Sequence, residues 1–265
     1  MYLATHPEIR MPLFKEPRFF AEPEPGIPFG GPRVDNRAEY ERLFDSPAPL
    51  RGESSPSYSQ YPRRSGVPER IHALLPEARF VYLVGDPIHR VVSHYMQRVA
   101  GEGERRPLSE ALGDVADPMN PYLCPSMYAM QVERYLQFFD RDRLLIVDRA
   151  DLSDDRRTTL REIFRFLGAD TDFESPIFAQ RANVGYRRLP RSYVAARNSR
   201  LGQLAARKVP NFVGRRINQS ARSLSSSAER PVVDDLLESR LRGVLGDDVR
   251  QLRAITGKAF PSWPL

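Results

Sequence analysis

The chain has 265 residues, of which 41% are hydrophobic and 28% are charged, a composition typical of a globular protein with a buried core. We find no apolar run long enough to cross a membrane and no apolar segment typical of a signal peptide near the start, so we expect neither. The net charge of +6 is local, because residues 181–222 hold eleven basic and no acidic side chains while the remainder carries −5.

Residues 1–70 are rich in proline and hold twelve of the chain's 24 prolines. Proline removes a backbone donor and clashes with the preceding helical turn, so a segment such as 22–32 (EPEPGIPFGGP) is predicted to be a loop. Within this region we expect a short helix over 36–44 and an extended piece over 50–53. A helix over 68–75 follows, in which we expect His72 to be structural.

A buried strand is predicted over 80–84 (FVYLV), because this apolar run is bounded by a Gly-Asp-Pro turn. The apolar side chains that follow recur with helical spacing, at Ile88, Val91, Val92, Tyr95, Met96 and Val99. Strand, tight turn and helix form the first half of a βαβ unit.

The same alternation continues further along the chain. The pattern predicts a helix over 127–139, a buried strand over 144–147 and a helix over 160–167 that ends at Gly168. Alternating strands and helices predict an α/β fold, an open parallel sheet with helices on both faces. Two amphipathic helices are expected within 231–265.

The chain has one cysteine, Cys124, which cannot form a disulfide within the chain. We expect it to be a small buried side chain in a protein of a reducing compartment.

Ligands of open α/β sheets bind at the carboxyl ends of the strands, so the turn after the first strand is where we expect a site. It reads GDPIHRVVSHY over 85–95, with Arg90 and Ser93 in the first turns of the helix. Helix N–H groups together with an arginine and a hydroxyl suit a phosphate. The spacing alone also fits an ordinary strand–helix unit with a surface arginine.

Four segments in sequence order resemble motifs of the sulfotransferase superfamily, in its glycan-type, heparan sulfate sulfotransferase-like bacterial branch. The 85–95 turn resembles the 3′-phosphate motif of that family, R-D-P-x-x-R-x-x-S-x-Y. The other three segments are residues 6–9 (HPEI) with 15–20 (KEPRFF), residues 52–58 (GESSPSY) and the stretch 138–168, which ends in FLG. Each resembles a block of the same family. The resemblance covers residues 1–185 well and the rest loosely.

This resemblance implies a P-loop-NTPase-like fold and a sulfuryl transfer from 3′-phosphoadenylyl sulfate (PAPS) to a hydroxyl of a carbohydrate or glycolipid, without a metal. It implies that Glu16 is the general base, since the family uses a glutamate in this block, and we expect Phe19 and Phe20 to form an apolar wall beside it. The alternative is a surface glutamate paired with Lys15 or Arg18.

Glu53 is the second catalytic candidate, expected either to orient the acceptor or a water or only to cap the helix that follows. In the nucleotide site the resemblance implies that Ser93 and Arg90 bind the 3′-phosphate. Gly85 stands where the family has the arginine that holds this phosphate together with the serine. Arg90 or an arginine of 181–191 would then replace it.

A later segment has the position of a loop that closes over the nucleotide in the family. There Gly185 would allow close backbone approach, Tyr186 would contact adenine or ribose, and Arg187 and Arg188 would supply charge. An ordinary basic loop is the alternative.

A second departure concerns the start of the chain. The family opens with a strand and a glycine-rich loop, K-x-G-T-T, that holds the 5′-phosphosulfate upstream of its H-P block, whereas here His6 follows Met1 closely and no such string occurs. We therefore expect this N-terminal strand and loop to be missing, which would expose apolar strand edges. Either the natural protein begins further upstream, or the chain is a truncated, inactive relative that binds a nucleotide or glycan.

We expect one sulfotransferase-like domain over 1–265. Its parts are a proline-rich acceptor region over 1–70, a βα core with the 3′-phosphate motif over 71–180, a basic segment over 181–222 and C-terminal helices over 223–265.

The basic amphipathic stretch 192–222 has two interpretations: it docks on an anionic membrane, or it packs on the domain with its arginines in water. We expect a cytoplasmic location, at the inner face of the membrane. No nucleic-acid partner is expected, because no helix-turn-helix, zinc-finger or RRM pattern occurs.

Overall fold

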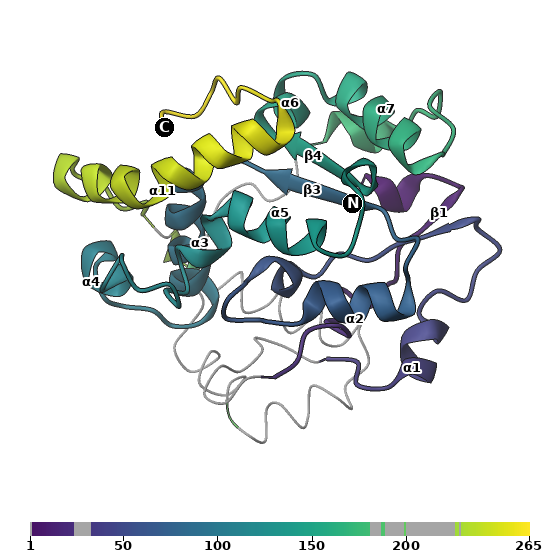
Figure 1. Ribbon diagram of the computed structural model, residues 1–265, viewed down its shortest axis with the longest axis horizontal. Helices are drawn as coiled ribbons and strands as arrows, with labels where there is room; N and C mark the ends of the chain where they lie inside the picture. Colours follow the sequence, from purple (N-terminus) through teal and green to yellow (C-terminus); the bar gives the residue numbers. More distant parts are fainter. Residues whose placement is uncertain (1, 24–32, 181–186, 189–198, 200–225, 228) are drawn as a thin grey trace.

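A parallel pair of strands, β3 (Phe80–Val84) and β4 (Leu144–Asp148), lies at the centre of the fold. The computed structural model describes residues 2–23, 33–180, 187–188, 199, 226–227 and 229–265 (Figure 1). Helices cover both faces of the strand pair: α2 (Val67–Leu74), α5 (Tyr128–Leu136) and α11 (Asp235–Thr256) pack on one face, and α7 (Arg156–Leu167) packs on the other.

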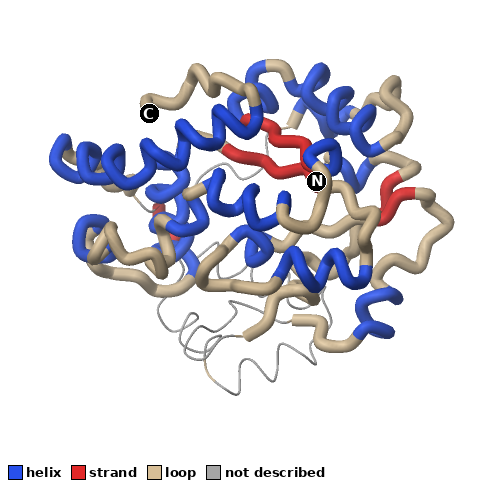
Figure 2. The backbone as a smooth tube through the Cα atoms, in the orientation of Figure 1, coloured by secondary structure: helices blue, strands red, loops and turns tan. Residues whose placement is uncertain are grey.

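The other described elements are short, apart from α3 (Figure 2). The helices are α1 (Arg37–Arg42), α3 (Pro87–Gly101), α4 (Leu108–Leu112) and α6 (Arg149–Asp154). The strands are β1 (Ile9–Arg10), β2 (Leu50–Arg51), β5 (Arg187–Arg188) and β6 (Ser226–Ser227). Single 3₁₀ turns lie at Leu3–Thr5, Pro56–Ser59, Cys124–Ser126, Arg141–Arg143 and Pro176–Ala179.

The predicted α/β fold is confirmed, because side chains of β3 and β4 point to two opposite faces and helices cover both faces. Val84 and Ile146 lie in the core beneath α5 and α11, whereas Val147 packs with Leu160 of α7. Successive side chains of a strand point to opposite faces, so both faces need helical cover. That cover is incomplete at Leu83, which is 48% exposed, and no third strand among the described residues pairs with β3.

Helix α3 begins directly after the turn that follows β3. The Asp86 carboxylate accepts hydrogen bonds from the backbone N–H groups of Ile88 (2.9 Å) and His89 (3.2 Å), and Pro87 occupies the first turn, where its missing N–H is harmless. The predicted apolar stripe of this helix is buried against α4 and the first half of α11. The start of α3 is therefore fixed relative to the end of β3.

The expectation of two C-terminal helices is wrong, because α11 is one continuous helix. Its buried stripe runs without a break through Leu241, Leu245, Val249 and Leu252. A glycine inside a helix costs only about 1 kcal/mol, so Gly246 does not end it. A tertiary contact also holds the middle of α11 in place. The Asp248 carboxylate accepts hydrogen bonds from the backbone N–H groups of Ala129 (3.0 Å) and Met130 (2.9 Å) and so caps α5.

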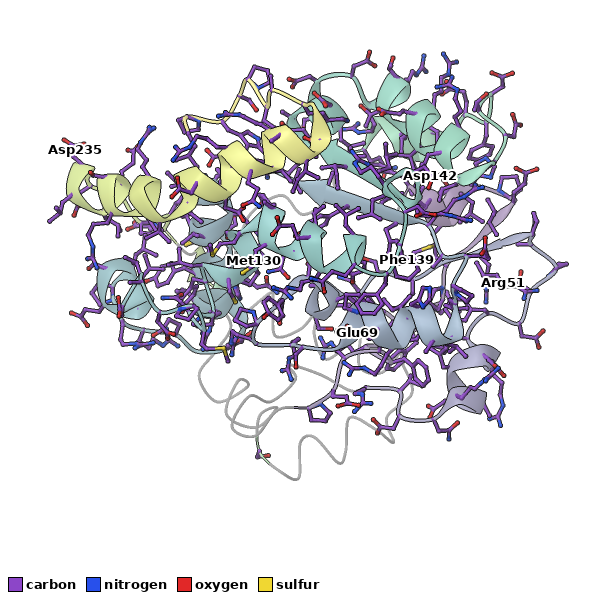
Figure 3. The ribbon with its side chains drawn as sticks, in the orientation of Figure 1. Arg51, Glu69, Met130, Phe139, Asp142 and Asp235 are labelled. Carbon is purple, nitrogen blue, oxygen red and sulfur yellow. The ribbon has the colours of Figure 1, made fainter. Side chains whose placement is uncertain are left out.

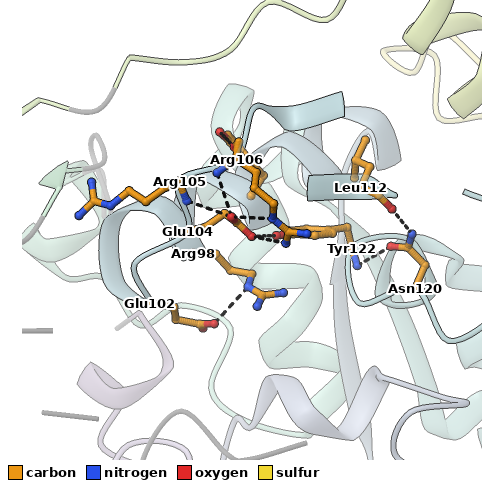
Figure 4. A network of polar contacts seen from close by, with 9 residues as sticks. Arg98, Glu102, Glu104, Arg105, Arg106, Leu112, Asn120 and Tyr122 are labelled. Carbon is orange, nitrogen blue, oxygen red and sulfur yellow. Dashed lines mark hydrogen bonds and ion pairs between the residues drawn. The ribbon is translucent and has the colours of Figure 1, made fainter. Parts of the chain in front are cut away.

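Figure 4 shows how the loop after α3 is held. The Glu104 carboxylate accepts hydrogen bonds from the side chain of Arg106 and from the backbone N–H groups of Arg105 and Arg106. The Arg106 side chain, with these backbone donors, lowers the pKa of Glu104 to about 2. Asn120 fastens the end of the loop by donating to the carbonyl oxygen of Leu112 at 2.6 Å.

Several local predictions are confirmed. Asn36 caps α1, and Gly168 ends α7 with a positive φ of 80°. Cys124 is a buried free thiol whose pKa burial raises to about 12. His72 lies on α2 with its ring against Phe139. Among the described helices, none combines the length and apolar character needed to span a membrane.

Candidate active site

Two short strands bring the first two sequence blocks together. β1 and β2 pair in parallel, with Ile9 opposite Leu50 and Arg10 opposite Arg51. Because paired parallel strands run in the same direction, the segments that follow, 15–20 and 52–58, leave the pair side by side. Arg51, labelled in Figure 3, marks the end of β2 from which the second of these segments continues.

His6 anchors this arrangement and takes no part in a catalytic group. Its ring is buried between Phe164 and Phe173, and its Nε2 lies 2.9 Å from the carbonyl oxygen of Asp170. The backbone N–H of Glu8 donates to the other ring nitrogen at 3.2 Å. Nε2 therefore fastens the start of the chain to the region after α7, while Nδ1 holds the local turn between His6 and Glu8.

Glu53 is the centre of a buried set of hydrogen bonds. Its carboxylate accepts from the hydroxyls of Tyr58 (2.6 Å), Ser55 (2.6 Å) and Tyr40 (3.2 Å). Burial raises the pKa of Glu53 although these three hydrogen bonds lower it. Glu53 therefore does not cap the following helix, one of the two roles expected for it, because its partners are side chains.

Glu16 is joined to Glu53 through two intervening residues. Its Oε2 accepts from the Arg18 guanidinium at 2.7 Å, and the backbone N–H of Arg18 donates to the Ser55 hydroxyl at 3.0 Å. The Ser55 hydroxyl in turn donates to Glu53. We call this set the carboxylate network; it consists of Glu16, Arg18, Tyr40, Glu53, Ser55 and Tyr58.

The backbone is strained where Glu16 and Arg18 lie. Both residues have φ of 56°, in the left-handed region that non-glycine residues rarely adopt. Such a conformation costs on the order of 1–3 kcal/mol and persists only where the surroundings hold it, a situation that clusters at functional sites. Here the Pro17 carbonyl accepts from Val34 N–H at 2.9 Å, and Ser55 holds Arg18 N–H.

Phe19 and Phe20 do not form the apolar wall expected beside Glu16. Phe19 stacks on Tyr40 at a centroid distance of 4.3 Å, and Phe20 is buried in the main core, so both rings serve packing. The Glu16 side chain is 24% exposed and is paired with Arg18, as the alternative interpretation expects; Lys15 lies 3.7 Å from its Oε1.

The second group of residues lies at the carboxyl ends of β3 and β4. Val84 pairs with Asp148, so the next residues in register are Gly85 and Arg149. A Cβ atom added at Gly85 would lie 3.4 Å from Nε of Arg149 and 3.5 Å from its Cβ. The Arg149 side chain therefore lies directly against the glycine.

His89 connects Arg149 with Ser93. Arg149 Nη2 lies 3.3 Å from His89 Nδ1, and the Ser93 hydroxyl lies 3.4 Å from the same nitrogen. A guanidinium can only donate, so this nitrogen accepts and the imidazole is neutral. Burial lowers the pKa of His89, the charges of Arg230 and Arg149 lower it further, and Asp86 opposes them. We call Gly85, His89, Ser93, Arg149 and Arg230 the arginine edge.

Arg90 lies apart from this edge. Its Nη1 donates to the Ser126 hydroxyl at 3.3 Å. Burial lowers the pKa of His94 to about 3, and the charge of Arg90 makes the largest further contribution to this lowering. Burial also raises the pKa of Tyr82 to about 12, against the opposing effects of Arg90 and Ser59. The Tyr82 side chain packs against the main core.

The later predicted residues are only partly described. Strand β5 lies beside α3 and pairs antiparallel with β6, with Arg187 opposite Ser227 and Arg188 opposite Ser226. The backbone of these two arginines therefore lies next to α3. Gly185, Tyr186 and the basic stretch 192–222, apart from Ser199, lie outside the described residues.

The sequence prediction missed Arg149 and Ser55, and it named Arg18 only as a possible surface partner of Glu16. A signal for Arg149 is present, because it lies two residues beyond the second predicted strand, 144–147, and parallel strands end at the same sheet edge. No comparable signal exists for Arg18 and Ser55, since strands of two residues carry no hydrophobic period.

Comparisons with known proteins agree with this fold. The model of the sulfotransferase family matches residues 32–173. A solved sulfotransferase from Alicyclobacillus acidocaldarius superposes with a TM-score of 0.69 at 24% identity, covering 100% of this chain and 92% of that one. The chain therefore belongs to the sulfotransferase family and has its fold.

Two curated relatives act on heparan sulfate by name. Mouse bifunctional heparan sulfate N-deacetylase/N-sulfotransferase 4 is 28% identical over 180 residues, which is 63% of this chain and 20% of that protein. Human heparan sulfate glucosamine 3-O-sulfotransferase 6 is 27% identical over 227 residues, which is 82% of this chain and 63% of that protein. The chain thus spans less than two thirds of the length of either relative.

Proposed function

We propose that the protein transfers the sulfuryl group of PAPS to a hydroxyl of a carbohydrate or glycolipid, with Glu16 as the general base. The observation that carries this proposal is the hydrogen-bonded path from the strained Glu16 through Arg18 and Ser55 to the buried Glu53. Family membership supports the reaction type. The carbohydrate acceptor is supported by the heparan sulfate named for two relatives, and a glycolipid offers the same hydroxyl chemistry.

The two oxygens of Glu16 have different roles in this proposal. Arg18 holds Oε2 at 2.7 Å and so fixes the direction of the carboxylate. Oε1 is left to the substrate, because its neighbour Lys15 is 3.7 Å away on an 86% exposed side chain. Oε1 takes the proton of the acceptor hydroxyl while the hydroxyl oxygen bonds to sulfur. The bond from sulfur to the 5′-phosphate oxygen breaks, and its electron pair stays on that oxygen.

Glu53 acts in this scheme as a positioning residue. Its carboxylate orients the Ser55 hydroxyl, which then accepts from Arg18 N–H. Arg18 would otherwise relax out of its left-handed conformation and release Glu16. Glu53 thus affects the rate through Arg18 and does not itself contact the acceptor.

The arginine edge fits the nucleotide end of the donor. Arg149, Arg230 and the Ser93 hydroxyl are donors suited to phosphate oxygens. The one carboxylate acting on His89, Asp86, already accepts two backbone N–H groups of α3. Asp148, on which the charge of Arg149 acts, likewise accepts the backbone N–H of Ala150. The carboxylates beside this edge are therefore engaged as helix caps, and a phosphate would supply a strong acceptor for Arg149 and Ser93.

The test is transfer of labelled sulfate. The full chain is incubated with sulfur-labelled PAPS and three acceptors: chemically desulfated heparan sulfate, a glycolipid and a simple phenol. We expect label in the saccharide acceptors and none in the phenol. A chain that binds 3′-phosphoadenosine 5′-phosphate (PAP) but labels no acceptor would be the inactive nucleotide-binding relative, and the proposal would be wrong.

A further inference from the structure

We propose that Arg149, at the end of β4, binds the 3′-phosphate of the donor nucleotide and takes the place of a side chain that β3 lacks at Gly85. This inference rests on the proposed function, because it assigns a ligand group to the nucleotide side of the same site. It concerns a residue that the sequence motifs do not single out.

The register of the sheet is the first argument. Gly85 and Arg149 are the first residues beyond the paired ends Val84 and Asp148 of β3 and β4. Neighbouring strands lie about 4.8 Å apart, so a guanidinium from either position reaches the same region above the edge. A Cβ atom at residue 85 would lie 3.4 Å from Nε of Arg149, so the Arg149 side chain borders the space that a side chain at residue 85 would enter.

The contacts of Arg149 are the second argument. Within the described part of the chain, its one hydrogen bond is a long one, 3.3 Å, to Nδ1 of the neutral His89, and the Ser93 hydroxyl lies 3.4 Å from the same nitrogen. Arg149 is exposed and no ion pair involves it among the described residues. One guanidinium and one hydroxyl therefore converge on a weak acceptor, which a phosphate oxygen would replace with a stronger one.

The charge around this point is the third argument. Arg230 acts on His89 together with Arg149. The two carboxylates beside these groups are engaged as helix caps, Asp86 at the start of α3 and Asp148 at the start of α6. A dianionic phosphate monoester matches two guanidiniums, whereas a neutral ribose hydroxyl would leave their charge uncompensated. The chemistry of the edge thus favours a terminal phosphate.

The experiment compares PAP with adenosine 5′-monophosphate, which lacks the 3′-phosphate, by isothermal titration on the full chain. We expect Arg149→Ala to weaken PAP binding at least about tenfold and to leave the binding of adenosine 5′-monophosphate within about twofold, as for the loss of a charged hydrogen bond. Arg165→Ala is the matched control, since Arg165 is exposed in the last turn of α7, at the other end of the strand pair. It should bind both nucleotides as the unmodified chain does.

A swap variant tests the positional claim. In Gly85→Arg with Arg149→Ala, the guanidinium moves to the neighbouring strand and the space beside residue 85 is vacated, so PAP affinity should return to within about threefold of the original. The inference is overturned if Arg149→Ala matches Arg165→Ala, if it weakens both nucleotides equally, or if the swap fails to recover binding. An unmodified chain that does not prefer PAP over adenosine 5′-monophosphate would overturn the proposed nucleotide site itself.

Discussion

The carboxylate network and the arginine edge satisfy their charges in different ways. In the network, Glu53 accepts from three hydroxyls and Glu16 is matched by Arg18, so the acidic groups are held by partners from three separate segments. At the edge, the hydrogen bond of Arg149 goes to a neutral imidazole, and the neighbouring carboxylates of Asp86 and Asp148 are engaged as helix caps. The network is thus organised before substrate arrives, whereas the edge gains its partner only when an anion binds.

The largest effect should come from removing the proton acceptor in the network. We expect Glu16→Gln to lower kcat about 10²-fold or more, because an amide cannot accept the acceptor's proton, while PAP affinity changes little. Steady-state sulfate transfer and PAP titration measure the two quantities. Glu41→Gln is the matched control, since Glu41 is an exposed glutamate on α1 paired with Arg37. Turnover of Glu16→Gln at the control's rate would move the base to another residue.

Removing the buried carboxylate should destabilise the fold. Glu53→Ala leaves the hydroxyls of Tyr40 and Tyr58 without their acceptor, so we expect the free energy of unfolding to fall by about 2 kcal/mol. Urea denaturation measures the change. An unfolding midpoint equal to that of the unmodified chain would mean that water replaces the carboxylate at no cost.

The raised pKa of Glu53 gives a pH signature in the same measurement. Its pKa lies above the ordinary value of 4.5, so the folded state holds this proton more tightly than the unfolded state does. The Glu53 contribution to stability is therefore greatest in acid and declines as pH rises from about 4.5 through the raised pKa. Glu53→Gln should lack this decline; the same pH dependence in both proteins would contradict the assignment.

At the arginine edge, loss of a hydroxyl should act on binding alone. Ser93→Ala is expected to weaken PAP binding by about 1–2 kcal/mol, because a hydrogen bond to a charged group is lost. Adenosine 5′-monophosphate should bind this variant and the unmodified chain alike. Equal losses for both nucleotides would assign Ser93 to the fold and not to the 3′-phosphate.

The smallest effect is expected within the network at Ser55. Ser55→Ala removes the acceptor of Arg18 N–H and so loosens the Arg18 side chain that holds Glu16, without removing either group. We therefore expect kcat to fall severalfold, equivalent to about 1 kcal/mol, with PAP affinity unchanged. Transfer kinetics and PAP titration together check this. A change in PAP affinity without a change in kcat would separate Ser55 from the chemistry.

The sequence predicts the core better than the site, for a physical reason. Continuous apolar runs mark β3 and β4, the period of 3.6 residues marks α3, and Gly168 marks the end of α7. Each of these signals is local. The continuity of α11 is supported by a contact between distant segments. The Asp248 carboxylate accepts the backbone N–H of Met130 at the start of α5, 118 residues away in the sequence.

The candidate site depends on contacts between distant segments. Sequence blocks identify Glu16 and Glu53, but only the parallel pairing of β1 with β2 brings them together. The apolar wall predicted for Glu16 fails because Phe19 stacks on Tyr40 and Phe20 is buried in the main core. Arg149 follows from the register of β3 and β4, which two predicted parallel strands suggest but do not fix.

The central claim is that the carboxylate network transfers the proton and the arginine edge binds the nucleotide phosphate. A double-variant cycle on Glu16 and Arg149 tests it most directly. Both kcat and the PAP dissociation constant are measured for Glu16→Gln, Arg149→Ala and the double variant. We predict that Glu16→Gln changes only kcat, that Arg149→Ala changes only PAP affinity, and that the double variant shows both effects at full size. A single variant that changes both quantities, or a double variant whose effects fall short of the two single ones, would contradict the account.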